Sequence, residues 1–167
     1  MGMNSFDLHN PKTLKEAVGL LDAKDTNFEK VKILAGGQDL LTELKDRLVE
    51  PEALVNLKSI PGLDKLTADA KGLTIGALVK VQQVAESPQV KKMFPALAMA
   101  AESVGSLQIR NMGTMGGNLC QRPRCWYYRN EQILCIKKGG DKCYAATGEN
   151  KYNAILGAAP SWIVHPS

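Results

Sequence analysis

Residues 108–143 read QIRNMGTMGGNLCQRPRCWYYRNEQILCIKKGGDKC and join two patterns on which the interpretation of the chain depends. The first part is rich in glycine, with Gly113, Gly116 and Gly117 close together. The second part contains every cysteine of the chain: Cys120, Cys125, Cys135 and Cys143. The glycine pattern is typical of a backbone that approaches a phosphate, whereas clustered cysteines are typical of a metal site.

The composition describes an ordinary globular protein. Its 167 residues suit one domain or two small lobes, and 44% apolar with 23% charged residues is unexceptional. A net charge of +4 is no argument for nucleic acid as a partner. The start, MGMNSFDLHNPKTL, has no apolar run, so we expect no signal peptide. No apolar run is long enough for a membrane span.

The remaining sequence alternates short strands and helices. Thr13 and Glu16 form a capping-box pattern before an apolar helix face. We expect strands at residues 31–34, 53–57 and 73–75, and helices at residues 14–21, 39–47, 79–85, 95–104 and from Pro88. This order predicts an α+β or α/β fold.

Paired glycines at Gly36 and Gly37 lie between an expected strand and an expected helix. That arrangement directs free backbone amides toward a ligand above the turn, although a plain turn has the same pattern. The P-loop and the G-x-G-x-x-G fingerprint are both excluded. A second glycine run follows Arg110, whose guanidinium suits a phosphate. Two such loops favour a nucleotide-type ligand.

The cysteines follow the spacing C-x4-C-x9-C-x7-C, which matches neither zinc knuckles nor the common ferredoxin patterns. Residue types alone leave structural zinc, an iron–sulfur cluster and no metal as alternatives. Six basic residues against two acidic ones favour an anionic thiolate site, but they do not separate zinc from iron. The basic residues are Arg122, Arg124, Arg129, Lys137, Lys138 and Lys142.

Five runs together resemble the FAD-binding subunit of the molybdenum hydroxylases, the family of xanthine dehydrogenase and aldehyde oxidoreductase. They are ILAGGQDLLTELK, LTIGAL, IRNMGTMGGNL, NAILG and IVHPS. The resemblance implies an α+β, two-lobed FAD-binding domain of the vanillyl-alcohol-oxidase (PCMH) type. Its lobes would be residues 1–58 and 59–167, with an inserted cysteine loop at about 119–148 (hereafter the cysteine loop). The family continues past residue 167, so we expect the chain to be truncated at its C-terminus.

The resemblance also implies where FAD binds, with its pyrophosphate between the lobes. The implied residues form a first glycine loop, a short middle segment and a second glycine segment. They are Leu34, Ala35, Gly36, Gly37, Gln38, Asp39, Leu40 and Leu41; Gly76 and Ala77; and Arg110, Gly113, Thr114, Gly116, Gly117 and Asn118. Val79 and Lys80 stand where the family often has a threonine, so no hydroxyl contact is expected there.

A subset of these subunits carries a 4Fe–4S cluster in an inserted loop, and the cysteine loop resembles the aldehyde oxidoreductase version. The implied ligands are Cys125, Cys135 and Cys143, with Cys120 the least certain. Trp126, Tyr127, Tyr128 and Tyr144 are candidates to shield such a cluster. Because the loop has few other apolar residues, we expect the metal to order it.

The function implied is electron transfer. Electrons would pass from a molybdenum-cofactor large subunit and a 2Fe–2S small subunit to FAD, and then to an external acceptor. No catalytic acid–base residue is expected in this chain. The alternative is a non-catalytic interaction module stabilised by zinc. The expected compartment is cytoplasmic by default, or periplasmic through export with a partner subunit.

Overall fold

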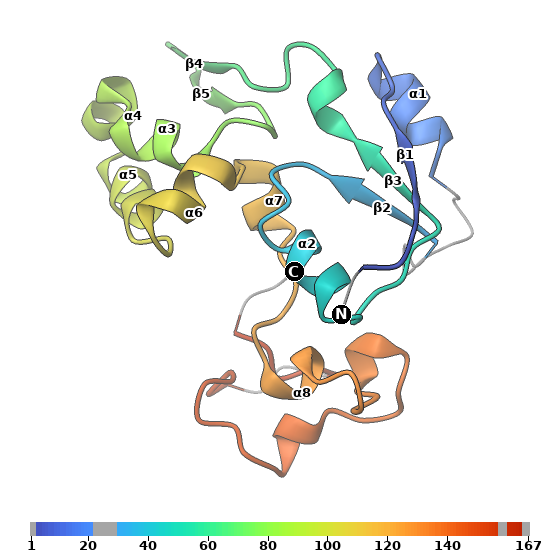
Figure 1. Ribbon diagram of the computed structural model, residues 1–167. Helices are drawn as coiled ribbons and strands as arrows, with labels where there is room; N and C mark the ends of the chain where they lie inside the picture. The colour runs from blue at the N-terminus through green and yellow to red at the C-terminus, as the bar shows by residue number, and fades with distance from the viewer. Residues whose placement is uncertain (1–2, 22–29, 157–159, 165–167) are drawn as a thin grey trace.

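The computed structural model describes residues 3–21, 30–156 and 160–164 of the chain. It is a mixed helix and strand structure, as the sequence predicted (Figure 1). The strands are β1 (Asp7–His9), β2 (Val31–Leu34), β3 (Ala53–Asn56), β4 (Leu66–Asp69) and β5 (Gly72–Ile75). The α-helices are α1 (Leu14–Gly19), α2 (Leu40–Lys45), α3 (Val81–Glu86), α4 (Pro88–Met93), α5 (Pro95–Glu102), α6 (Leu107–Met112), α7 (Met115–Leu119) and α8 (Trp126–Arg129). Short 3-10 turns are η1 (Leu57–Ser59), η2 (Ile136–Lys138) and η3 (Tyr144–Ala146).

The first lobe is built on a parallel sheet in which β3 lies between β1 and β2. The central strand is the most buried, with Val55 fully inaccessible to solvent. Ala17 of α1 packs with Val55 and Ile60 to form the core of this lobe. Ile60 belongs to this core, so the packing of the first lobe continues past residue 58. The sequence analysis had placed the end of the first lobe at residue 58.

The second lobe has a separate core under the β4–β5 hairpin. Val79 and Val84 are fully buried there, and they pack with Val90, Ala98 and other residues of α3, α4 and α5. Leu73 and Ile75 of β5 cover one side of this cluster. Two separate cores give the described chain two lobes.

The described residues after α7 form a third region and belong to neither core cluster. In Figure 1 this orange-to-red segment lies beneath α2, apart from both lobes. It contains α8, η2 and η3 and is otherwise irregular. Ile155, in an apolar run near the end of the described chain, is 94% exposed.

Several sequence predictions are confirmed, and two need correction. Thr13 accepts a hydrogen bond from the amide of Glu16 at 3.1 Å, as a capping residue should. The Glu16 carboxylate, however, accepts from the amide of Lys12 and not from that of Thr13. The second glycine segment is not a simple loop, because α7 forms within it. Strands β1 and β4 were missed because three or four residues of mixed polarity give no clear period.

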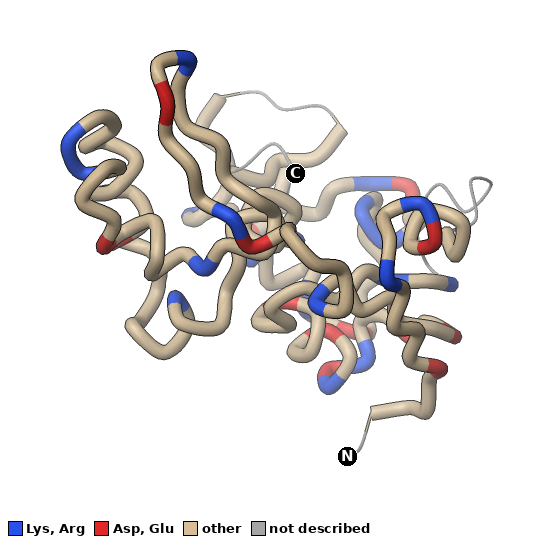
Figure 2. The backbone as a smooth tube through the Cα atoms, turned by 90° about the horizontal axis from the view of Figure 1, so that it is seen from above, with Lys and Arg blue, Asp and Glu red and all other residues tan. Residues whose placement is uncertain are grey.

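The charged residues of the described chain are mixed in sign along the backbone (Figure 2). None of the described helices is long and apolar enough to cross a membrane. The longest of them, α5, has eight residues.

Helix α2 ends at a strained residue, which gives a first prediction. Arg47 has φ of +51°, and the hydrogen bond from Leu48 N to Glu43 O at 2.9 Å closes a Schellman-type cap around it. Glycine adopts this conformation without the Cβ penalty. We expect Arg47→Gly to raise the free energy of unfolding by about 1 kcal/mol, measured by urea denaturation.

Arg47→Ala is the matched control, because it removes the guanidinium but keeps the strained Cβ. An equal gain in Arg47→Ala would show that side-chain charge, and not backbone strain, is responsible.

Candidate functional site

The first glycine loop connects β2 to α2 and presents unpaired backbone donors. Gly37 has φ of +80°, a conformation that favours glycine. The amides of Gly36, Gly37 and Gln38 make no hydrogen bond within the part of the chain that the structure describes. Consecutive free amides of this kind form a concave site for an anionic group.

The structure brings the three segments implied for FAD together where the lobes meet. A Cβ on Gly36 would lie 2.3 Å from the carbonyl oxygen of Met112, just before the second glycine segment. A Cβ on Gly116 would lie 2.9 Å from the carbonyl oxygen of Ala77. Glycine at Gly36 and Gly116 therefore permits a backbone-to-backbone approach that any other residue would prevent. The location of FAD among these residues stays a prediction.

The second glycine segment contributes fewer open donors than its sequence suggests. Its amides already donate within the chain: Gly113 N to Ile109 O, Met115 N to Val79 O, Gly116 N to Ala77 O, Gly117 N to Thr114 Oγ1, and Asn118 N to Thr114 O. Thr114 is 2% exposed and caps α7. Gly116 of α7 thus serves close packing against Ala77.

Arg110 is also partly engaged. Its Nε donates to Gln82 Oε1 at 2.7 Å and its NH1 donates to the carbonyl of Val104 at 3.2 Å. These contacts hold the guanidinium against α3 and the end of α5. Its predicted contact with a phosphate stays untested.

The close approach at Gly36 can be tested by substitution. We expect Gly36→Ala to lower the free energy of unfolding by about 1–3 kcal/mol, because the new methyl group would overlap the Met112 carbonyl. Urea denaturation measures this directly. Gly19→Ala is the control, since a Cβ there meets no atom within 4 Å. Equal stabilities for the two variants would contradict the tight contact.

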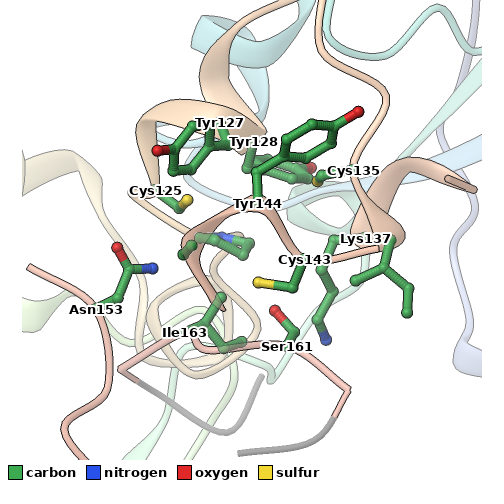
Figure 3. Close-up of a pocket in the computed structure, with 13 residues that line it drawn as sticks. Cys125, Tyr127, Tyr128, Cys135, Lys137, Cys143, Tyr144, Asn153, Ser161 and Ile163 are labelled. Atoms are coloured by element: carbon green, nitrogen blue, oxygen red, sulfur yellow. The ribbon is translucent and has the colours of Figure 1, made fainter. Parts of the chain in front are cut away.

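Three of the four cysteines line one small cavity. Cys125, Cys135 and Cys143 border a space of about 10 Å³ beneath α8 (Figure 3). Cys135 is buried, whereas Cys125 and Cys143 are half-buried. Cys120, at the end of α7, is exposed and does not line the cavity. The structure thus separates the three firmer candidates from the least certain one.

The walls of this cavity are mainly apolar and aromatic. Tyr127 and Tyr144 stack with ring centroids 5.9 Å apart, and Tyr128 is 2% exposed. All three tyrosines line the cavity, whereas Trp126 does not. Ser161 also lines it and is 8% exposed, yet its hydroxyl makes no hydrogen bond among the described residues. A buried hydroxyl with no partner among the described residues is uncommon and suits a ligand in the cavity.

These residues fit a thiolate-bound metal in kind but are not already arranged around one. Among the described residues, which include every cysteine, no group of three or more His, Cys, Asp or Glu could hold a metal ion. Soft thiol donors in an apolar pocket suit zinc or an iron–sulfur cluster. Metal binding would require the thiols to rearrange.

The cysteine loop is attached to α2 by a buried polar network that the sequence analysis missed. The Asp39 carboxylate accepts from Arg122 N at 2.7 Å and from Arg129 NH2 at 2.7 Å, and it also pairs with Arg124. One turn further along α2, buried Glu43 accepts from Tyr128 OH at 3.1 Å. Tyr128 OH in turn accepts from Arg122 Nε at 3.0 Å.

This network engages side chains that the sequence analysis had considered for other roles. Arg124 and Arg129 pair with the Asp39 carboxylate, whereas the Arg122 guanidinium donates to Tyr128 OH and to the Lys137 carbonyl. The Asp39 side chain, placed in the FAD loop by resemblance, is directed to the cysteine loop. The network and buried Tyr128 also give the loop a source of order other than metal. The sequence contains an acidic i, i+4 pair and a distant arginine-rich loop, but nothing in it indicates that the two meet.

The network shifts the ionisation of its carboxylates in opposite directions. Burial alone would raise the pKa of Asp39, but the Arg122 amide and the Arg129 and Arg124 cations lower it overall. The pKa of Glu43 is raised, because it is buried and because the Asp39 charge repels it, against weaker opposition from Arg129. Burial also raises the pKa of Tyr128. The Asp39 carboxyl group is therefore ionised over a wider pH range than the Glu43 carboxyl group.

The raised pKa of Glu43 gives a pH-dependent prediction. Its folded pKa exceeds its unfolded pKa, so its stabilising contribution is complete below the ordinary glutamate range and is lost as the pH rises through the raised value. Glu43→Gln can still accept from Tyr128 but does not ionise. We expect the stability of this variant relative to wild type to increase from acidic to neutral pH, measured by urea denaturation at several pH values.

Glu50→Gln, on the exposed stretch after α2, controls for a general loss of negative charge. A difference between Glu43→Gln and wild type that does not vary with pH would contradict the raised pKa.

Comparison with known proteins shows where this chain has relatives. A family model described as the FAD binding domain in molybdopterin dehydrogenase matches residues 4–126. The nicotinate dehydrogenase FAD-subunit of Eubacterium barkeri is 41% identical over 118 residues, covering 70% of this chain and 39% of that protein. The solved carbon monoxide dehydrogenase of Hydrogenophaga pseudoflava that lacks the Mo-pyranopterin moiety aligns with a TM-score of 0.65 at 36% identity, covering 71% of this chain and 40% of its own.

A third relative is similar over a longer stretch. The aldehyde oxidoreductase FAD-binding subunit PaoB of Escherichia coli is 37% identical over 139 residues, 81% of this chain and 43% of that protein. A match of this length cannot fit within residues 1–126, so it extends into the cysteine loop. In each comparison the chain spans about two fifths of the length of its relative.

Proposed function

We propose a function from one premise: the chain belongs to the family of FAD-binding domains in molybdopterin dehydrogenases. We propose that it is the flavin-carrying, electron-transferring part of a molybdenum-containing dehydrogenase of the aldehyde or xanthine type. The observation that carries this proposal is the first glycine loop. Its free amides lie where the two lobes meet, inside the residues that the family model matches.

The residues of the first glycine loop would hold the pyrophosphate of FAD. The amides of Gly36, Gly37 and Gln38 would donate to phosphate oxygens, and the absence of side chains at the two glycines would let the backbone come close. Bound FAD would supply the redox chemistry, accepting electrons and passing them on. The other residues implied for FAD binding would line the site between the lobes. The fold would be the two-lobed PCMH type.

The cysteine cavity would hold a 4Fe–4S cluster. Cys125, Cys135 and Cys143 would ligate it, with Cys120 as the fourth ligand after a local rearrangement. Two observations support this proposal: three thiols share a cavity with a buried hydroxyl that has no hydrogen-bond partner among the described residues, and the similarity to PaoB extends into the cysteine loop. The comparisons give no support to a non-catalytic zinc module.

Partner chains would supply the substrate chemistry. Relatives are named as medium chains or as FAD-binding subunits, which supports a complex with a molybdenum-cofactor large subunit and a 2Fe–2S small subunit. Electrons would leave FAD for an external acceptor. The complex would be cytoplasmic, or periplasmic if a partner carries an export signal.

Flavin binding is the direct test of the proposed function. We expect the purified chain, incubated with FAD and desalted, to keep stoichiometric FAD with a flavin absorbance spectrum, identified by mass spectrometry. Gly36→Ala should lose most of it, whereas Gly19→Ala should retain it. A wild-type chain that is folded but retains no FAD would contradict the proposal.

The cysteine site has its own test. After reconstitution with iron and sulfide, Cys135→Ser should lose the iron and acid-labile sulfide that wild type retains, while keeping FAD at saturating flavin. Cys120→Ser compares the exposed cysteine with a cavity cysteine. Equal iron in Cys135→Ser and wild type would remove Cys135 from the ligands, and stoichiometric zinc without iron would contradict the cluster.

A further inference from the structure

Asp39 belongs to both candidate sites at once. Its backbone ends the first glycine loop and starts α2, while its carboxylate binds three groups of the cysteine loop: the Arg122 amide, Arg129 and Arg124. The side chain makes no capping hydrogen bond to its own helix. The carboxylate therefore serves the contact between the two segments and not the local stability of α2.

A second contact fixes the same helix face to the cysteine cavity. Tyr128 lines the cavity and its hydroxyl donates to buried Glu43, one turn along α2 from Asp39. Arg122 holds the Tyr128 hydroxyl and also donates to the Lys137 carbonyl, between two of the cysteines. A wall of the cavity and the first glycine loop are thus both attached to α2.

The connections form a closed ring through the chain. The first glycine loop, which leads into α2, packs at Gly36 against Met112 and Gly113. Those residues lead through α7 to Cys120 and the start of the cysteine loop, which returns to Asp39 through Arg122. A displacement of the cysteine loop must therefore move α2, strain the ring or break the contacts at Asp39.

From this geometry we propose that Asp39 is a positioning residue that couples the two sites. Filling the cysteine cavity would hold α2 and the first glycine loop in place and so tighten FAD binding, and FAD would in turn hold the cysteine loop. Coupling of two binding equilibria is reciprocal. The inference rests on the proposed function, because it takes FAD as the ligand of the first glycine loop.

Two variants of opposite charge separate positioning from simple electrostatics. Asp39→Asn removes a negative charge next to a phosphate site, which by charge alone should strengthen FAD binding. Arg129→Gln removes a positive charge, which by charge alone should weaken it. Positioning predicts that both variants bind FAD more weakly, because each breaks the same contact. The expected loss is about five- to tenfold in the dissociation constant.

The experiment compares these variants in two readouts with the whole purified chain. The first is the FAD dissociation constant from flavin fluorescence, with and without prior iron and sulfide reconstitution. The second is the rate at which a thiol reagent modifies the metal-free protein, with and without FAD. Asp46→Asn, at the other end of α2, is the control, since no ion pair of Asp46 occurs among the described residues.

In wild type and Asp46→Asn we expect reconstitution to tighten FAD binding and FAD to slow modification of buried Cys135. In Asp39→Asn and Arg129→Gln both effects should be lost, with Cys135 reacting faster even without FAD. Circular dichroism checks folding. If Arg129→Gln is unfolded, Arg124→Gln replaces it, since the Arg124 side chain is 59% exposed and its loss should be milder. If Asp39→Asn is unfolded, Asp39→Glu replaces it, because it keeps the charge but displaces the carboxylate, so that charge alone predicts no change in FAD binding.

Each outcome decides a different claim. If wild type does not bind FAD, the proposed function fails and the coupling fails with it. If wild type binds FAD but the variants bind equally well, or change with opposite sign, the proposed function stands and the coupling is overturned. Weaker binding by both variants, with thiols no longer protected by FAD, supports the coupling.

Discussion

The arrangement of this chain depends on the contact between the first glycine loop and the start of the second glycine segment. Gly36 approaches the Met112 carbonyl so closely that no side chain fits between them. This contact joins a parallel-sheet lobe to a helical lobe that has its own core. The free amides of residues 36–38 consequently face the junction of the two lobes, where a ligand can contact both.

The cysteine loop adds a third region that is held mainly by polar contacts. In this attachment the Asp39 carboxylate accepts from the Arg122 amide and from the side chains of Arg124 and Arg129. The buried Glu43 carboxyl group accepts from the Tyr128 hydroxyl. Breaking such a partly buried network usually destabilises a protein more than breaking a surface ion pair. A loop attached in this way can keep its position while its thiols rearrange around a metal.

Local patterns in the sequence predicted the elements that have strong local signals. The apolar run at residues 31–34 is β2, and Thr13 caps α1 as its spacing indicated. The close approach of Gly36 to Met112 was not predicted, because a plain turn has the same paired-glycine pattern. Helix α7 was not accessible: two of its five residues are glycine, and it forms because Thr114 caps it and residues 77–79 accept its amides.

The partners of Asp39 could not be read from the sequence either. Arg122 and Arg129 are more than 80 residues away, and only the folded chain shows that the Arg122 amide and the Arg129 side chain contact Asp39. The same holds for Ser161, which meets the cysteines only in the folded structure. Residue types suggested the chemistry of both sites, whereas long-range packing determined which residues serve each of them.

The central claim is that the open amides of the first glycine loop bind FAD, and an NMR titration tests it most directly. The ¹⁵N-labelled chain would be titrated with FAD while the amide resonances are followed. The account predicts large shifts for Gly36, Gly37 and Gln38, and smaller ones for residues 115–118, whose amides are already engaged. Binding that leaves the resonances of residues 36–38 unchanged would contradict it.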